Sequence, residues 1–147
     1  MTFKKDLELG EYYEYKLIDI LKPVNYLKKE GLFKDYDLEI IDKNEMKIYY
    51  EVKCDKYTNT TNNICIEYEC NKKPSGITTT TADYYAYFVI DKYNDKKYYN
   101  LYIIPVIDIM ELIKNKKYHC IKNLGDNLAS KCYLFNKNIF NEFKYKL

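Results

Sequence analysis

Residues 46–55 read Met-Lys-Ile-Tyr-Tyr-Glu-Val-Lys-Cys-Asp, and this stretch decides the fold. Apolar, aromatic and thiol side chains occupy its even-numbered positions, whereas most of its odd-numbered positions are charged. Because successive side chains of a strand point to opposite faces, this period of two predicts a strand from about Met46 to Cys54 with one face in the core. Glu51 and Lys53 then share the other face, which places a carboxylate beside an ammonium group.

A second carboxylate, Asp37, precedes this strand. It lies near the start of the apolar segment 36–41, and the polar residues 42–45 predict a turn that folds the two segments into a hairpin. The hairpin brings Asp37 next to Glu51 and Lys53. Two converging carboxylates can hold Mg²⁺ through oxygen ligands, and a nearby lysine can orient a water molecule or stabilise a developing negative charge. This pattern indicates metal-assisted phosphodiester hydrolysis.

The composition is that of one globular domain. The chain has 147 residues, of which 47% are hydrophobic and 31% are charged, enough for a single core across residues 1–147. The formal net charge of +2 gives no strong basic field toward nucleic acid, although an acidic site can offset a basic binding face. All 24 basic residues are lysines, so phosphate contacts must come from lysine, hydroxyl and backbone N–H groups.

The five cysteines indicate free thiols. They form no CxxC pair, and the single histidine, His119, cannot complete a zinc-finger spacing. We expect each cysteine to be a small buried hydrophobe, and we expect a reducing cytoplasmic location, viral or otherwise intracellular. No apolar segment follows the charged start, and no run approaches the ~18 apolar residues of a membrane span, so neither a signal peptide nor a membrane anchor is expected.

The order of the predicted elements favours an α/β domain. A helix spans residues 6–21 and ends before Pro23, and a third strand at 64–70 follows the hairpin after a polar loop. The later predicted elements are a short capped helix formed by the last threonines and residues 82–85, strands at 87–90 and 98–104, a helix beginning at Pro105, a strand at 131–135 and a short terminal helix. This order, a helix, a three-strand meander, a helix and further strands, predicts one mixed β-sheet flanked by helices.

Asp37, Glu51 and Lys53, in this order and spacing, resemble the signature of the PD-(D/E)xK nuclease superfamily, which has a restriction-endonuclease-like core. The resemblance extends to about Ile113 and is nearest to small phage and archaeal Holliday-junction-resolvase-like proteins. Tyr36 stands where the nominal proline of the signature would be. The resemblance implies that Asp37 and Glu51 ligate Mg²⁺, for which Mn²⁺ can substitute, and that Lys53 positions the attacking water or stabilises the pentavalent phosphate. It also implies an endonuclease that acts on DNA, with branched or structured DNA as one expected substrate.

Members of this superfamily often add an acid from the first helix. Glu14 is followed by Leu17, Ile18 and Leu21 at helical spacing, so it is expected to project from the sheet-facing stripe toward the site. Glu11, one turn earlier, is the rival, and an ordinary surface glutamate is the alternative for both. We favour Glu14 as the fourth catalytic residue.

Two further glutamates, Glu67 and Glu69, share a face of the predicted third strand. One of them could tune Lys53 or hold a water molecule near the site. The simpler alternative is a cross-strand charge pair with Lys47 or Lys53.

The turn after the third strand gathers groups that suit a phosphate backbone. Lys72 and Lys73 supply ammonium groups, and Ser75 and Thr79 supply hydroxyls near a predicted helix start. Hydroxyls that only cap the helix are the competing interpretation. Three tyrosines are candidates for stacking on splayed bases: Tyr57, Tyr84 and Tyr85.

A second class of function fits the same fold, namely a catalytically silent module that binds nucleic acid or a protein. The near-neutral charge, the absence of arginine and the small size favour it. Cleavage of a DNA panel would separate the two classes, and binding that is insensitive to salt would indicate a protein partner. Junction resolution needs two active sites, so a homodimer through residues 105–113 or 98–104 is expected for an enzyme of that kind.

Overall fold

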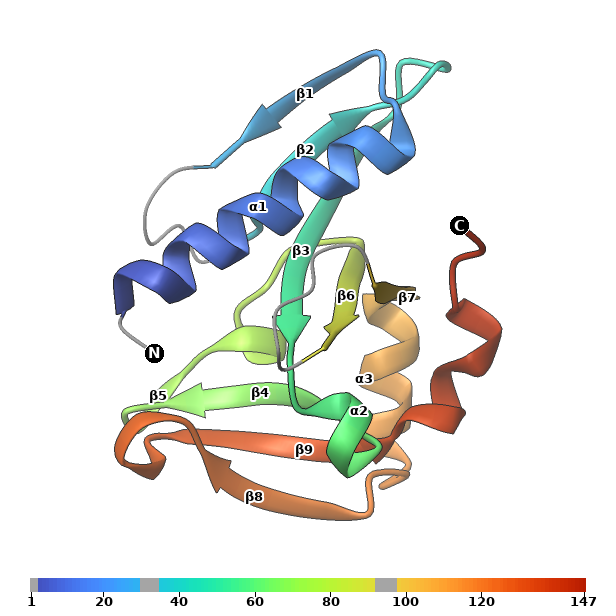
Figure 1. Ribbon diagram of the computed structural model, residues 1–147. Helices are drawn as coiled ribbons and strands as arrows, with labels where there is room; N and C mark the ends of the chain where they lie inside the picture. The colour runs from blue at the N-terminus through green and yellow to red at the C-terminus, as the bar shows by residue number, and fades with distance from the viewer. Residues whose placement is uncertain (1–2, 30–34, 92–97) are drawn as a thin grey trace.

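The computed structural model describes residues 3–29, 35–91 and 98–147. It consists of a long helix, a five-stranded sheet and a four-stranded sheet, arranged in layers with the five-stranded sheet in the middle (Figure 1). The structure therefore has the α/β class and the mixed sheet that the sequence predicts. None of the helices in these described ranges is long and apolar enough to span a membrane.

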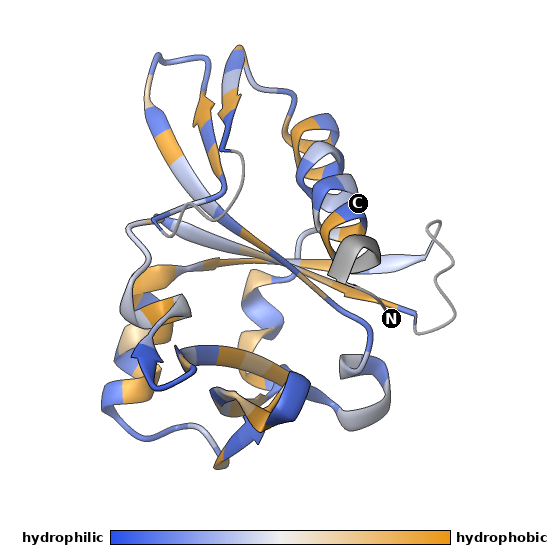
Figure 2. Cartoon of the chain, turned by 90° about the vertical axis from the view of Figure 1, so that its left-hand side faces the viewer, coloured by the Kyte–Doolittle hydropathy of each residue, from blue (hydrophilic) through white to orange (hydrophobic). Residues whose placement is uncertain are grey.

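Helix α1 (Phe3–Leu21) covers one face of the five-stranded sheet and agrees with the helix predicted at residues 6–21. Apolar and hydrophilic residues alternate along it at helical spacing (Figure 2). Tyr13 and Leu17, one turn apart, are buried, and the ring of Tyr13 contacts that of Phe88 with centroids 4.8 Å apart. The helix ends where Lys22 adopts a φ of 48° and Pro23 follows.

The five-stranded sheet has the strand order β1-β2-β3-β6-β7. The bounds of its strands are Asn25–Lys28 (β1), Leu38–Ile41 (β2), Lys47–Asp55 (β3), Tyr84–Ile90 (β6) and Tyr99–Pro105 (β7). β3 runs parallel to β6, and all other neighbours are antiparallel. The register pairs Glu51 with Tyr85 and Lys53 with Tyr87, so the candidate site residues of β3 share a face with two tyrosines of the core.

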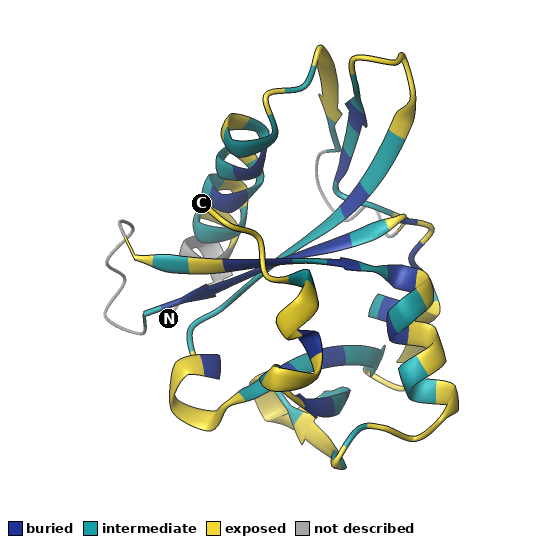
Figure 3. Ribbon diagram, turned by 90° about the vertical axis from the view of Figure 1, so that its right-hand side faces the viewer, coloured by how far each residue is buried: buried dark blue, intermediate teal, exposed yellow. Residues whose placement is uncertain are grey.

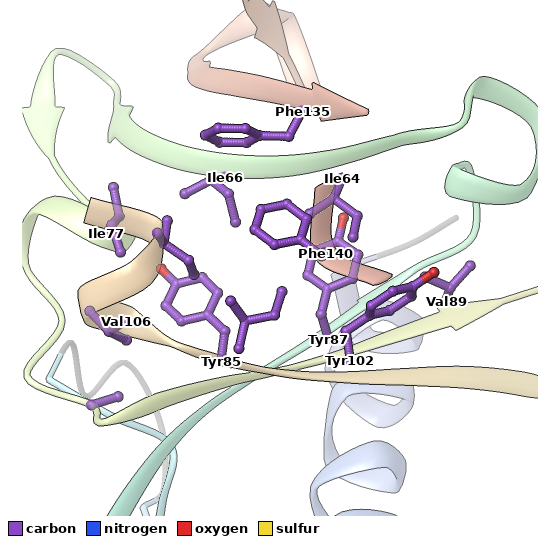
Figure 4. Close-up of a cluster of buried hydrophobic side chains, with 13 residues drawn as sticks. Ile64, Ile66, Ile77, Tyr85, Tyr87, Val89, Tyr102, Val106, Phe135 and Phe140 are labelled. Carbon is purple, nitrogen blue, oxygen red and sulfur yellow. The ribbon is translucent and has the colours of Figure 1, made fainter. Parts of the chain in front are cut away.

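The four-stranded sheet has the order β5-β4-β9-β8. Its strands are Asn63–Cys70 (β4), Lys73–Pro74 (β5), Cys120–Leu124 (β8) and Ser130–Asn136 (β9). A hydrophobic cluster fills the space between the two sheets, where Ile64, Ile66 and Phe135 pack over Tyr85 and Tyr87 (Figure 4). Helix α3 (Val106–Lys114) and the 3-10 helix η3 (Lys137–Phe143) close this cluster.

Burial is greatest in the middle layer. In β6 every residue after Tyr84 is buried, whereas the outer sides of α3 and η3 are exposed (Figure 3). The sequence predicts Pro105 as the first helical residue of α3, whereas in the structure it is the N-cap, one position earlier.

The predicted three-strand meander of residues 36–41, 46–54 and 64–70 is wrong in its third strand. β3 already has β2 on one edge and β6 on the other, so no edge is left for β4, which pairs with β9 in the other sheet. The meander of the structure is β1-β2-β3 instead. The strand β1 was missed because four residues on a sheet edge, three of them exposed, give no periodic signal.

The predicted short helix through residues 82–85 is also wrong. The backbone of Asp83 donates to Tyr49 and that of Thr81 donates to Asp35, so these groups bond to other segments and not along a helix. Tyr84 and Tyr85 begin β6. Two single turns occur nearby, α2 (Thr58–Thr61) within the predicted polar loop and the 3-10 turn η1 (Gly76–Thr78), and a further 3-10 turn, η2 (Asp126–Leu128), precedes β9.

All five cysteines are free thiols, as predicted, but only Cys132 is buried. The other four are partly exposed, so the expectation of five buried hydrophobes is wrong for them.

Candidate functional site

Asp37 is fixed against β3 by backbone hydrogen bonds. Its own N–H donates to the carbonyl of Tyr50 at 3.0 Å, and its Oδ2 accepts a hydrogen bond of 2.8 Å from the N–H of Val52. These contacts hold the Asp37 side chain at the middle of β3, beside Glu51. The hairpin geometry that the sequence indicates is therefore present.

Glu51 and Lys53 form an ion pair on one face of β3, with Nζ of Lys53 3.4 Å from Oε1 of Glu51. The hydroxyl of Thr80 donates to the other carboxylate oxygen of Glu51 at 3.4 Å. The Glu51 side chain is 13% exposed, whereas that of Lys53 is 42% exposed. The carboxyl is thus held inside the protein, while part of the Lys53 side chain remains exposed.

Burial raises the pKa of both carboxyl groups. For Glu51 the pKa rises from 4.5 to about 7, because burial and then Asp37 outweigh the opposing effect of Lys53. For Asp37 burial likewise raises the pKa, against the opposing effects of Lys53 and of the Val52 N–H. The two groups are coupled, because the charge of Asp37 makes Glu51 harder to ionise. With a pKa of about 7, Glu51 is therefore protonated in a large part of the molecules near neutral pH.

Lys53 stays charged in this setting. Burial alone would lower the pKa of its ammonium group, but Glu51, Asp37 and Glu67 together outweigh burial and raise it. The site therefore contains a fixed positive charge beside two carboxyls that ionise reluctantly.

Glu14 of α1 approaches the same acids from the helix side. Burial and the charge of Asp37 raise its pKa, and Lys28 of β1 opposes them. Lys28 lies 3.2 Å from Glu14 and 3.7 Å from Glu11, and its side chain is only 9% exposed. Glu14 is 16% exposed and Glu11 53% exposed, so Glu14 is the glutamate that faces the site and Glu11 lies at its margin.

Glu67 and Glu69 have separate roles, contrary to the shared face that the sequence predicts. A register shift in β4 between them turns the two side chains apart. Glu67 accepts a hydrogen bond of 3.0 Å from Ser75 and acts on the charge of Lys53. Glu69 pairs with Lys131 at 3.1 Å, and Lys47 pairs with Glu39 at 3.4 Å.

The predicted phosphate-binding turn is split by the fold. Lys72 and Lys73 are exposed in the turn that leads through β5, as phosphate contacts would require. Ser75 is turned inward to Glu67, and the hydroxyl of Thr79 contacts the carbonyl of Gly76 at 3.4 Å. Tyr85 is buried and Tyr84 stacks on Tyr50 with centroids 5.5 Å apart, so of the three candidate stacking tyrosines only Tyr57 has a widely exposed ring.

The donor set at Asp37 and Glu51 fits a hard divalent cation. Mg²⁺ binds through one or two carboxylates and completes its shell with water and phosphate oxygens. Within the described ranges no cluster of three or more His, Cys, Asp or Glu side chains is arranged to hold a metal ion, so the protein would supply two carboxylates. Among those residues the buried hydroxyl of Tyr85 has no hydrogen-bond partner, and its pKa is raised by burial and then by Glu51, Glu67 and Asp37. An oxygen ligand entering the site could satisfy this group.

Three contributors to the site were not found by reading the sequence. Lys28 lies in the missed strand β1, and Thr80 reaches Glu51 from a segment predicted to be helical. Tyr85 was one of three candidates for base stacking and is instead buried under the site. No sequence pattern indicated these roles, because they depend on how β1, β2, β3 and β6 pair.

Comparisons of the chain with known protein families, with curated proteins and with solved structures found no match.

Proposed function

We propose that this protein is a metal-dependent nuclease that hydrolyses phosphodiester bonds in DNA. The observation that carries the proposal is the position of two acids beside one lysine: the N–H of Val52 fixes Asp37 against β3, and Glu51 lies 3.4 Å from the ammonium group of Lys53. Carboxyl groups whose pKa is raised by burial, next to a charged lysine, are typical of sites that perform chemistry.

Each residue has a role that follows from its position. Asp37 and Glu51 would hold Mg²⁺ or Mn²⁺ once both carboxyl groups are ionised. The bound ion supplies an activated water molecule and neutralises charge on the phosphate. Lys53, partly exposed and 3.4 Å from Glu51, is placed to orient the attacking water or to offset charge on the pentavalent phosphate. Glu14 completes the acidic wall on the helix side, with Lys28 holding it in place.

We further propose that the core is of the restriction-endonuclease-like type. Support comes from the sequence of a helix, the antiparallel meander β1-β2-β3 and a later strand β6 that is parallel to β3. The acid at the start of β2 and the Glu-x-Lys triplet in β3 occupy the positions that the superfamily signature requires. The connection from β3 to β6 differs from the resemblance, because it passes through β4, β5 and η1 and not through a long helix.

A cleavage assay tests the proposal. Duplex, single-stranded, forked and four-way-junction DNA are incubated with Mg²⁺ or Mn²⁺ and with the wild type, Glu51→Gln or Lys53→Ala. Removal of a group that stabilises transition-state charge typically costs about 10²–10³ in rate, and we expect losses of this size for both variants.

The control is the ion pair of Glu39 and Lys47, which lies in the same hairpin. Its ion-pair distance is 3.4 Å, as for Glu51 and Lys53, and its carboxylate is 12% exposed, against 13% for Glu51. Glu39→Gln and Lys47→Ala should cleave like the wild type. Equal cleavage by wild type and Glu51→Gln would contradict the proposal, and saturable DNA binding without any cleavage would favour the silent binding module.

A homodimer is our proposal for the case in which branched DNA is the substrate, because two strands must be cut. On α3 the side chains of Ile107 and Met110 are exposed, although Val106 and Ile109 are buried in the core. Sedimentation of the protein with a four-way junction gives the stoichiometry. Junction cleavage by a 1:1 complex would overturn this proposal.

A further inference from the structure

A groove of about 910 Å³ opens beside the candidate site. Its lining residues come from α1, the end of β3, the turn α2, the strands β4, β8 and β9 and the turn between β8 and β9, and they include Lys53 and Glu67. Lys53 thus belongs both to the candidate site and to the wall of the groove. The ammonium group of Lys53 lies 3.4 Å from Glu51, so Lys53 is where the groove meets the candidate site.

The inner surface of the groove is uncharged over most of its length. Its lining includes Val52, Cys54, Cys65, Cys132 and Leu134, whose side chains are apolar or thiols. Burial raises the pKa of Cys65 to about 12 and that of Cys132 to about 11, so both thiols are neutral at physiological pH. A surface of this kind suits flat, weakly polar groups and not a phosphate chain.

The acids in the groove near β3 and β4 are already bonded to the protein. Asp55 accepts hydrogen bonds from the hydroxyl of Tyr87 and, at 2.7 Å, from the N–H of Tyr57. Glu67 accepts the hydroxyl of Ser75. Their negative charge is therefore partly offset within the fold, and Asp126 at the β8 end is the exposed acid of the lining.

The rim of the groove carries cations and an open aromatic ring. The side chain of Tyr57 is 61% exposed, and Nζ of Lys56 lies 5.5 Å from the centroid of its ring. Lys122 of β8 is exposed on the opposite rim. Lys53, Lys56 and Lys122 thus give the groove three cations beside its apolar and thiol lining.

We propose that this groove binds a single, unpaired strand of nucleic acid and delivers it to the candidate site. The inference rests on the proposed nuclease function and adds to it the class of substrate, an unpaired strand or a frayed end. Bases enter the uncharged floor and stack on Tyr57, while Lys56 and Lys122 contact phosphates. Single-strand sites combine a positive groove with aromatic stacking in this way. A groove of this volume admits a few nucleotides of one strand and excludes the two paired strands of a duplex.

Binding is measured without divalent metal, so that it is independent of cleavage. Fluorescence anisotropy compares a labelled oligothymidine with a duplex of the same length, for the wild type and for Tyr57→Ala and Lys122→Ala. We expect the wild type to bind the single strand more tightly than the duplex, and Tyr57→Ala to lose about tenfold in affinity for the single strand. For Lys122→Ala the slope of log affinity against log salt concentration should be shallower by about 0.7. Tyr26→Ala and Lys43→Ala, which remove exposed residues of β1 and of the 42–45 turn, are the matched controls.

Alkylation of the thiols locates the bound strand. Cys54, Cys65 and Cys132 line the groove, whereas Cys70 and Cys120 do not. Because burial keeps Cys65 and Cys132 protonated and slow to react, Cys54 is the thiol to follow. Oligothymidine should slow the alkylation of Cys54, measured by mass spectrometry, and leave that of Cys70 and Cys120 unchanged.

The outcomes separate this inference from the proposed function. Single-strand binding that depends on Tyr57 and Lys122, with no cleavage under any metal, would support the groove and overturn the nuclease. Cleavage together with equal affinity for single strand and duplex, unchanged by both substitutions, would overturn the groove alone. Absence of oligothymidine binding would also overturn it.

Discussion

Replacing Glu51 by glutamine should stabilise the metal-free protein at neutral and alkaline pH. The folded protein keeps the Glu51 proton up to about pH 7, whereas the unfolded chain releases it near 4.5. Between these values the folded state binds more protons, so stability falls as pH rises. One pKa unit is worth about 1.4 kcal/mol, so the buried carboxylate costs the wild type about 3 kcal/mol at pH 8. Glutamine cannot ionise and avoids this cost.

The groups around Glu51 also contribute to this pH dependence of stability. The charge of Asp37 acts on Glu51, so the measured midpoint belongs to the pair. Lys53 and the hydroxyl of Thr80 favour the ionised form, and both effects are already contained in the pKa of about 7. The amide of glutamine can still donate to Asp37 and accept from Thr80, which limits structural side effects.

Urea unfolding at a series of pH values between 4 and 8 measures the effect. The free energy of unfolding of Glu51→Gln minus that of the wild type should grow by about 3 kcal/mol over this range, a shift in midpoint of roughly 1–2 M urea. Glu39→Gln, equally buried but paired one to one with Lys47, controls for the loss of one charge and should show no such growth. A difference that is the same at pH 4.5 and pH 8, or that shrinks with rising pH, would refute the reasoning.

Three further predictions concern metal binding, catalysis and the backbone. Mg²⁺ should raise the melting temperature of the wild type, and its binding should release close to one proton near neutral pH and weaken as pH falls. In calorimetric titration Asp37→Asn should show no Mg²⁺ binding. Lys53→Ala should bind Mg²⁺ nearly like the wild type yet cleave far more slowly in single-turnover kinetics, and a large loss of metal affinity would contradict its role. Gly76→Ala should cost about 3 kcal/mol in urea unfolding, because φ is +55° and a Cβ would lie 2.2 Å from the carbonyl oxygen of Glu67; Gly10→Ala, with open space in α1, should gain up to about 1 kcal/mol.

Local patterns predicted the elements of the site better than their arrangement. The period of two at residues 46–55 follows from the local geometry of a strand, in which successive side chains point to opposite faces. It therefore placed Glu51 and Lys53 correctly on one face of β3. The polar turn at 42–45 was equally local, and it brought Asp37 to β3. Partner choice between strands is not local, because it depends on which edges the whole sheet leaves open. The separation of β4 from the meander therefore could not be read from the sequence.

The same limit explains which site residues were missed. Lys28 is one of 24 lysines and becomes distinctive only because β1 carries it, with 9% of its side chain exposed, to Glu14. Thr80 reaches Glu51 because the preceding turn packs closely on β4 at Gly76, where a side chain would collide with the carbonyl oxygen of Glu67. Such roles are set by tertiary packing, and no spacing along the chain encodes them.

The balance of charge at the site is an argument against a purely structural role. The other buried carboxylate of the hairpin, Glu39, has its own lysine, as an ordinary ion pair does. At the candidate site Glu14, Asp37 and Glu51 lie around Lys28 and Lys53, whose charges Glu11 and Glu67 also share, and burial raises the pKa of all three acids. Replacing a carboxyl proton by a divalent ion would make the local charge more positive by one unit, which favours a phosphodiester. A fold that needed only stability would gain by losing one acid, so the retained excess favours a site built to bind a cation and then an anion.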